Sequence, residues 1–317
     1  MITGLNASAE RFLVALARIS ERVSRAERQI TSGRRIESAS DEPDQVSGLL
    51  IARAQLEQTI QIRTNLGRAK AEADTAEQAV ATAAKLLQRV NTLAVQGATS
   101  SQTPTQRMII AQEVGAALDQ MVNIASTQVE GRYIFSGDDY RNAPYSADPA
   151  GPHGVSAYAG SPATREIMHP SGTRFVISRS ADAIFDNPAP GASVFAAMNN
   201  LRIALEAVPT ASEGDPAYNV QFEAQTAAIR DALAGVRSAQ DHLGSELSHY
   251  GTIQNRIAEA VETARKLELR QKSELSAIED TDVTQAALEL SQASAHKEVV
   301  LASHARTAGR SLFDYLG

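Results

Sequence analysis

The stretch IRTNLGRAKAEADTAEQAVATAAKLLQRVNTLA, residues 62–94, carries the clearest structural signal in the chain. Apolar residues recur in it at alternating steps of four and three, without a polar interruption, at Ile62, Leu66, Ala69, Ala73, Ala76, Val80, Ala83, Leu87, Val90 and Ala94. This heptad spacing is typical of helices that pack lengthwise in a coiled coil. Because many seam positions are alanine, the partner helix is expected to approach closely.

A similar seam runs towards the N-terminus, through Leu5, Ala9, Phe12, Leu16, Ile19, Val23, Ala26 and Ile30. We expect this first helix to stop near Gly33, which suits a left-handed C-terminal cap. A loop should follow, and a second helix should then begin with Pro43 in its first turn. Ser40, Asp41 and Glu42 are candidate caps for that second helix.

The remaining helical patterns lie on both sides of the middle of the chain. A polar turn with Pro104 separates the second helix from a third, whose two adjacent seams between residues 110 and 129 predict more than one neighbour. A further pattern runs from Phe222 to Ile278, interrupted by Thr226, Gln240, Gln254, Glu268 and Gln271. Patterns this long exceed the average globular helix of about 11–12 residues and favour a rod.

The middle of the chain has a different composition. Seven of the eleven prolines fall between Pro144 and Pro190, which predicts a separate, loop-rich insertion. Residues 165–168 and 173–178 are expected strands around a turn at 169–172, and 155–159 is a third candidate. The predicted fold is therefore mainly α, an elongated antiparallel coiled-coil rod formed by the N- and C-terminal halves, with a small β-rich inserted domain. The expected divisions are an N-terminal assembly helix (1–40), the N-terminal half of the rod (41–136), the insertion (137–195), the C-terminal half of the rod (196–272) and a C-terminal assembly helix (273–317).

Composition restricts the classes of function. Aromatic residues make up 4% and tryptophan is absent, which disfavours a large spherical core. The net charge of −7, from 30 basic and 37 acidic residues, leaves no basic stripe for nucleic acid. With no cysteine, the chain offers no thiolate for redox, zinc or nucleophilic chemistry. No apolar run approaches the roughly 20 residues of a membrane span, and the start lacks an ordinary secretory signal, so we expect no membrane insertion.

Polar residues give no catalytic, cofactor or metal site. No metalloprotease, nucleophile-elbow or phosphate-loop motif occurs. The acidic cluster at residues 41–44 lacks the spacing of a calcium loop, so a capping role is preferred. His242 and His249 stand two helical turns apart, and a solvated surface is favoured over a metal site. The glycines of segment 131–137 enclose bulky residues that would obstruct a phosphate, so this segment is interpreted as the exit from a helix.

Four segments resemble the bacterial flagellin family, and one of them, LLQRVNTLAVQGAT, residues 86–99, is similar to a helical element of the family. QITSGRRIESASDEPD, residues 29–44, is similar to a family element and matches it at Ser32, Gly33, Arg35, Asp41 and Pro43. GRYIFSGDDYRNAPY, residues 131–145, resembles the hook–filament junction branch of the family at Gly131, Tyr133, Phe135, Gly137 and Pro144. LSAIEDTDVTQAALELSQ, residues 275–292, is similar to a C-terminal element shared by both branches.

The resemblance implies a structural role in the flagellum, outside the cell, at the junction of hook and filament. It implies terminal helices that order when subunits assemble into a ring, with neighbours that are another hook-associated protein and flagellin. It also implies export through the flagellar apparatus and an export chaperone that binds the C-terminal helix. The expected assembly-interface residues are Phe12, Leu16, Ile19, Val23 and Ile30, packing against Val299, Leu301, Leu312, Phe313 and Leu316.

Other classes of function stay open on the sequence. The chain could be a short flagellin that forms the filament itself. It could instead be an enzyme or ligand-binding module whose site lies in residues 137–195, or a cytoplasmic coiled-coil scaffold. Convergent carboxylates or histidines in a pocket of the insertion would favour the enzyme.

Overall fold

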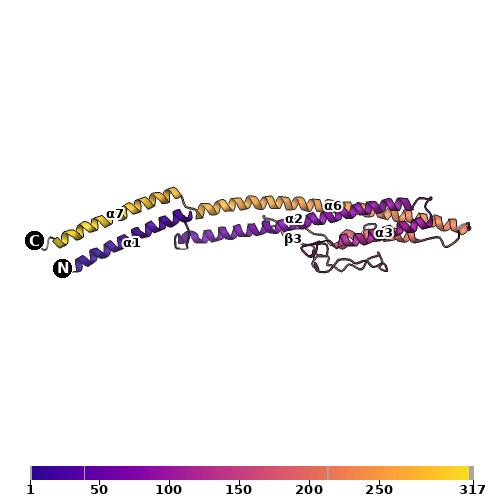
Figure 1. Ribbon diagram of the computed structural model, residues 1–317, viewed down its shortest axis with the longest axis horizontal. Helices are drawn as coiled ribbons and strands as arrows, with labels where there is room; N and C mark the ends of the chain where they lie inside the picture. The colour runs from indigo at the N-terminus through magenta and orange to yellow at the C-terminus, as the bar shows by residue number, and fades with distance from the viewer. Residues whose placement is uncertain (1, 39, 213, 314–317) are drawn as a thin grey trace. The chain divides into compact units, whose positions relative to one another are not determined.

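The computed structural model describes the backbone of residues 2–38, 40–212 and 214–313, and the side chains of residues 9–305 within these ranges. The described chain is mainly α-helical, with two short antiparallel strand pairs, which confirms the predicted fold class. In chain order the elements are α1 (Ile2–Ser32), α2 (Pro43–Gly97), α3 (Pro104–Ala125), β1 (Gln128–Val129), β2 (Arg132–Tyr133), β3 (Glu166–Met168), β4 (Arg174–Val176), α4 (Ala181–Phe185), α5 (Val194–Glu206), α6 (Pro216–Glu279) and α7 (Val283–Phe313) (Figure 1). In the described part, no helix is both long and apolar enough to cross a lipid bilayer.

The long helices begin and end close to where the sequence predicts. α1 ends at Ser32, and Gly33 follows with φ of +70°, as expected of a C-terminal cap. α2 begins at Pro43, and Thr103 caps α3 through a reciprocal pair of hydrogen bonds with Gln106. α6 is continuous over 64 residues, so its interrupted apolar pattern does not break the helix.

The chain forms two compact units, one of residues 1–60 and 266–317 and one of residues 61–265. The boundaries fall inside α2 and α6, whereas the sequence places them at turns and composition changes. Residues 137–195 belong to the second unit together with the helices, and they contribute to the same buried core. The insertion therefore does not form a compact unit of its own.

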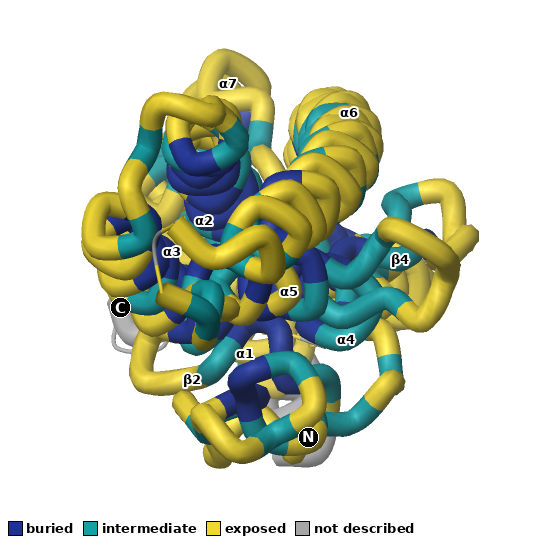
Figure 2. The backbone as a smooth tube through the Cα atoms, turned by 90° about the vertical axis from the view of Figure 1, so that its right-hand side faces the viewer, coloured by how far each residue is buried: buried dark blue, intermediate teal, exposed yellow. Residues whose placement is uncertain are grey.

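The core of the second unit is built on the seam of residues 62–94. From Leu66 onward every seam residue is buried, and Ile62 is partly buried, which confirms the predicted packing face. The buried stretches of α2 and α3 are dark blue in Figure 2. Facing residues come from α3, α5 and α6, and the ion pair between Arg89 and Glu113, at 3.6 Å, links α2 to α3.

Polar residues that interrupt the α6 pattern make bonds to other elements in the second unit. Gln240 accepts a hydrogen bond from Asn91 at 3.2 Å, and Gln254 donates to Asp74 at 3.0 Å and to Glu77 at 2.7 Å. Buried amides and hydroxyls remain in a helix seam only when they find such partners. The interruptions therefore set the register of α6 against α2 without ending the helix.

The small β part agrees with the sequence in one hairpin and differs elsewhere. β3 and β4 pair antiparallel, with Ile167 opposite Phe175, around the expected turn. The candidate strand 155–159 is absent; Val155 makes only an isolated bridge to Ala147. The segment 131–137, interpreted as a simple helix exit, instead begins in the turn of the β1–β2 hairpin and includes β2; Glu130 and Gly131 of this turn both have positive φ.

Four aromatic rings, three from the insertion and Phe135 just before it, pack into the shared core. Phe135 meets Phe185 with centroids 5.8 Å apart, and Phe195 contacts both Tyr145, at 5.0 Å, and Phe185, at 6.0 Å. Burial raises the pKa of Tyr145 far above its ordinary value, and the nearby Asp186 carboxylate acts in the same direction. The few aromatic residues of the chain thus gather where the insertion joins the helices.

Candidate functional site: the terminal helix pair and the helix break

The first unit holds α1 and α7, which run antiparallel and side by side (Figure 1). The ring of Phe12 stacks on that of His304 at 3.8 Å, and Arg22 pairs with Glu289 at 3.3 Å. On α7 the positions that face α1 alternate by four and three residues and are occupied by Ala286, Leu290, Ala293, Lys297, Val300 and His304. The antiparallel pairing of chain ends follows from two heptad patterns in one chain.

This helix pair has a thin apolar interface. Among its described side chains only Ala26, Ala286 and Ala293 are fully buried, and the larger seam residues are half-buried. Burial of a methyl or methylene group contributes about 0.8 kcal/mol, so three alanines contribute little. Two helices of 31 residues therefore gain much less from burial than the helices of the second unit.

The predicted assembly residues divide into three groups in this structure. Phe12, Leu16, Ile19, Val23 and Ile30 are half-buried on the face of α1 that meets α7. Val299 and Leu301 are 65% and 44% exposed, so in the single chain they do not form the partner surface of α1 that the sequence analysis proposed. Leu312, Phe313 and Leu316 lie outside the residues whose side chains the structure describes.

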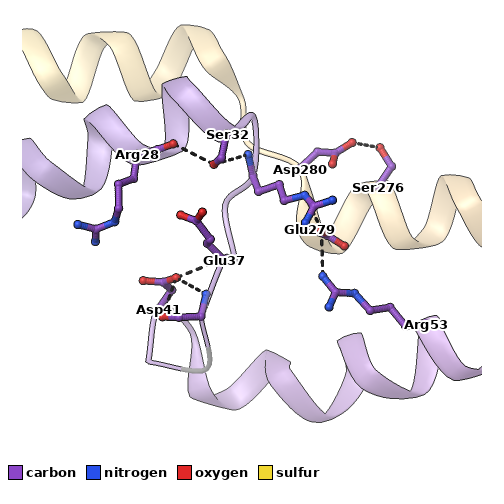
Figure 3. Close-up of polar contacts among 10 residues, drawn as sticks. Arg28, Ser32, Glu37, Asp41, Arg53, Ser276, Glu279 and Asp280 are labelled. Carbon is purple, nitrogen blue, oxygen red and sulfur yellow. Dashed lines mark hydrogen bonds and ion pairs between the residues drawn. The ribbon is translucent and has the colours of Figure 1, made fainter.

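The break between α1 and α2 lies against the break between α6 and α7 (Figure 3). The Arg35 amide donates to the carbonyl of Glu279 at 2.6 Å, and the Thr281 amide donates to the carbonyl of Gly33 at 3.0 Å. Arg34 and Asp280 form an isolated antiparallel bridge at the same level. The two helix breaks are thus linked to each other by backbone hydrogen bonds.

Glu279, the last residue of α6, is the electrostatic centre of this break. One of its carboxylate oxygens, Oε1, lies 2.8 Å from Arg34 Nε and 3.0 Å from an Arg53 terminal nitrogen. The Glu279 side chain is 7% exposed, whereas those of the two arginines are 56% and 43% exposed. A nearly buried carboxylate therefore joins the end of α1, the start of α2 and the end of α6.

Arg35 of the family motif adds a second set of bonds. Its guanidinium donates to the carbonyl of Ile278 at 2.8 Å and to the side chain of Gln45 at 3.1 Å, and it pairs with Glu42 at 3.5 Å. The fork of five N–H donors that arginine presents suits such divergent partners. This motif residue therefore connects α2 to the last turn of α6.

Asp41 organises the loop before α2. Its carboxylate accepts from the amides of Glu37, at 3.1 Å, and Ser38, at 2.7 Å (Figure 3). The hydrogen bond from the Ser38 amide lowers the pKa of Asp41 below its ordinary value. Capping was the predicted role, but the amides that Asp41 satisfies precede it in the loop and do not belong to the first turn of α2. In the described residues, no group of three or more histidine or acidic side chains is placed to hold a metal ion.

The second family motif has a local structural role in the second unit. Gly131, with φ of +74°, turns the β1–β2 hairpin, and the Tyr133 amide donates to the carbonyl of Tyr140 at 2.9 Å. A Cβ on Gly137 would lie 2.1 Å from the carbonyl oxygen of Ser161, so only glycine fits there. The Pro144 carbonyl accepts from the amide of Ala159 at 2.9 Å, which joins two loops of the insertion.

A groove of about 960 Å³ lies between α2 and the insertion in the second unit. Its lining mixes arginines, carboxylates and tyrosines, and it contains no histidine among the described residues. Two of these charged side chains, Glu72 and Arg165, form an ion pair with each other.

Sequence reasoning missed Glu279 and Arg53 of the break and Arg107 of the second unit. Arg107 is fully buried, and its guanidinium donates to Gln225 and to Thr226, each at 2.8 Å, and lies 4.1 Å from the Phe222 ring centroid. Burial lowers the pKa of Arg107. Neither periodicity nor motif spacing signals such contacts, because each joins residues more than 100 positions apart.

Comparison with known proteins agrees with this architecture. Residues 5–139 match the family model described as the bacterial flagellin N-terminal helical region, which confirms the predicted resemblance. The chain is 28% identical to flagellar hook-associated protein 3 of Salmonella typhimurium, over 80% of each chain.

Two solved structures share the fold. The hook-associated protein HAP-3 of Legionella pneumophila matches with a TM-score of 0.63 at 15% identity, over 72% of this chain and 98% of the other. FlgL of Xanthomonas campestris matches with a TM-score of 0.55 at 17% identity, over 70% of this chain and 99% of the other.

Proposed function

We propose that this chain is a structural subunit of the bacterial flagellum that joins the hook to the filament. The observation that carries this proposal is the similarity, across 80% of both chains, to a protein named for its association with the hook. The junction-type motif at residues 131–145 supports the same branch of the family. We assign the chain a structural role, without catalysis, a cofactor or a metal.

The terminal helix pair supports polymerisation through α1 and α7. The pair buries only small side chains and leaves Leu13, Val14, Leu288 and Val299 more than half exposed. Fixing the backbone costs about 1–2 kcal/mol per residue, and so thin an interface offsets little of this cost. Contacts with neighbouring subunits supply the missing burial, and α1 and α7 become fully ordered on assembly.

A ring of such subunits explains the placement of the partners. A heterologous contact repeated about an axis closes into a ring or continues as a helix. One rim of this ring contacts a second hook-associated protein, and the other rim contacts flagellin. The subunit reaches this place outside the cell through the flagellar export apparatus. An export chaperone binds the C-terminal helix before export.

Immunogold electron microscopy of intact flagella tests the proposal. The antibody is raised against residues 137–195, which we expect to face outward. A band of label where the hook meets the filament is the expected result. Label along the whole filament would make the chain a short flagellin, and label absent from flagella would overturn both assignments. Flagella from a strain that lacks the gene serve as the control for antibody specificity.

A further inference from the structure

The groove of about 960 Å³ in the second unit has three walls. One face of α2 supplies Thr64, Arg68 and Glu72, which are spaced by about one helical turn. The hairpin of β1 and β2, with the loop after it, forms the second wall, and the hairpin of β3 and β4 forms the third. Ordinary ligand sites have volumes of about 300–1,000 Å³. The groove is therefore large enough for an elongated ligand.

Charged side chains of both signs line this groove in equal number. They are the arginines Arg68, Arg132, Arg165 and Arg174 and the carboxylates Glu72, Glu130, Asp138 and Glu166. Arg165 and Glu72 pair with each other, and the Arg132 guanidinium lies over the ring of Tyr140, 4.9 Å from its centroid. The other five make no hydrogen bond or ion pair within the described chain. Opposite charges thus converge on one hollow and keep their hydrogen-bonding groups available.

The balance of charge restricts the chemistry of the ligand. A charged ligand would meet groups of its own sign on both hairpin walls, where arginines and carboxylates occur together. An apolar ligand would cover these charges without offering them a partner, which is costly. A neutral ligand rich in hydroxyl groups avoids both costs, because a hydroxyl can donate to a carboxylate and accept from an arginine.

We infer that this groove binds a segment of a neutral oligosaccharide. Hydroxyl groups of the sugar donate to the carboxylates of Asp138 and Glu166. Other hydroxyl groups accept from the guanidinium groups of Arg68 and Arg174. The half-buried Ile167 supplies apolar surface for the C–H face of a sugar ring. This binding goes beyond the junction role and does not depend on it, because every lining residue belongs to the second unit.

The arrangement of the charged groups favours a sugar over an extended peptide. Hydroxyl groups project from a sugar ring in several directions, which matches charged side chains on three walls. The main-chain donors and acceptors of an extended peptide point along two opposite edges. A peptide would therefore satisfy the groups of two walls and leave those of the third unpaired.

An oligosaccharide array probed with the purified full-length chain tests the inference. The array carries neutral oligosaccharides from plant and fungal cell walls, from animal mucins and from bacterial surface polysaccharides, so the class that is bound identifies the source. Acidic oligosaccharides and unmodified peptides are printed beside them. We expect binding to neutral oligosaccharides. Binding confined to the acidic oligosaccharides or to the peptides, or no binding at all, would overturn the inference and leave the junction role intact.

Substitutions in the groove locate the binding. Arg174→Ala and Asp138→Ala should each raise the Kd for the neutral oligosaccharide bound best on the array, measured by calorimetry, about 5- to 20-fold, as expected for one hydrogen bond to a charged group at a partly exposed site. Both side chains are exposed and make no bond within the described chain, so the fold should be unaffected. Arg237→Ala and Asp241→Ala, exposed on α6 outside the groove lining, are the matched controls. An unchanged Kd in both groove variants would show that the sugar binds elsewhere.

A steric block and a salt series give independent readouts. Gly67 lines the groove, and a Cβ there would meet no atom within 4 Å, so Gly67→Met should reach into the groove and weaken binding without disturbing α2. Gly48→Met, at an equally open position outside the groove, should bind like the wild type. Salt should change the affinity less than about twofold between about 0.05 and 0.5 M, because screening acts on pairs of charges. A fall of about tenfold or more would indicate an ionic ligand and overturn the inference.

Discussion

Replacing Glu279 by glutamine tests whether its carboxylate holds the helix break closed. The substitution keeps the shape of the side chain and removes the charge that faces Arg34 at 2.8 Å and Arg53 at 3.0 Å. The backbone bonds across the break, such as that from the Arg35 amide to the Glu279 carbonyl, remain. The effect should therefore be a higher population of the open break, without unfolding of the helices.

The magnitude follows from the exposure of the three side chains. Losing one partner of a fully buried pair costs about 3–5 kcal/mol, and exposed pairs contribute about 0.2–1 kcal/mol. Glu279 is nearly buried, but both arginines are about half exposed and regain water when the charge is removed. We therefore expect a loss of about 1–2 kcal/mol for the two contacts together. This corresponds to a roughly 5- to 30-fold rise in the open population.

Limited trypsin digestion measures this opening, because Arg34 and Arg35 are cleavage sites within the break. When closing is faster than cleavage, the cleavage rate follows the open population. The rate at these two bonds, followed by mass spectrometry, should rise by the same 5- to 30-fold in Glu279→Gln. Glu274→Gln, an exposed change on the same helix, is the matched control and should cleave at the wild-type rate. A wild-type rate for Glu279→Gln, or equal acceleration in both variants, would refute the role of the carboxylate.

Three further predictions concern other parts of the chain. Arg107→Met should lower the unfolding free energy of the second unit by about 2–4 kcal/mol, because the buried side-chain oxygen of Gln225 loses its hydrogen-bond donor and the cation–π contact with Phe222 is lost. Urea denaturation followed by circular dichroism measures this loss. An unchanged denaturation midpoint would contradict the prediction. The pKa of Asp41 is lowered, so the hydrogen bond that its carboxylate accepts from the Ser38 amide stabilises the loop at pH values above about 3.9, the pKa of aspartate in the unfolded chain. This stabilisation is lost as the pH falls through the pKa of the folded state. A midpoint at or above about 3.9 in an NMR titration of the carboxyl group would show this reasoning to be wrong. Leu16→Asp should weaken the α1–α7 pair by about 1–3 kcal/mol and prevent incorporation into flagella while the second unit stays helical; normal incorporation, judged by immunoblotting of isolated flagella, would refute terminal packing.

The sequence predicts local features of this fold well. Gly33, Pro43 and Pro104 locate three helix boundaries because each residue acts through its own backbone geometry. The hairpin of β3 and β4 is also predictable, since its strands are separated by a short turn. These features depend on neighbours within a few residues, and that information is present in any short window of the chain.

Long-range features were not predictable in the same way. Glu279 has no partner within its own helix that would distinguish it from other glutamates at helix ends, and its two arginines lie more than 200 residues away in the chain. The insertion appeared separate because its composition differs, but its rings are buried against helices whose seams are already apolar. Val299 was assigned to the inner face of α7 because the irregular C-terminal pattern allows more than one heptad register, and the structure places it on the outer face.

The two heptad seams of the chain illustrate why similar spacing produces unequal stability. In the second unit the seam positions of α2 are apolar without exception, and nearly all are buried by several neighbouring elements. On α7 the equivalent positions include Lys297 and His304, and α1 packs against this face. A seam with a lysine and several alanines specifies which helices pair and in which direction, but it contributes little free energy. The helix break, with its buried carboxylate and reciprocal backbone bonds, therefore sets where the pair starts.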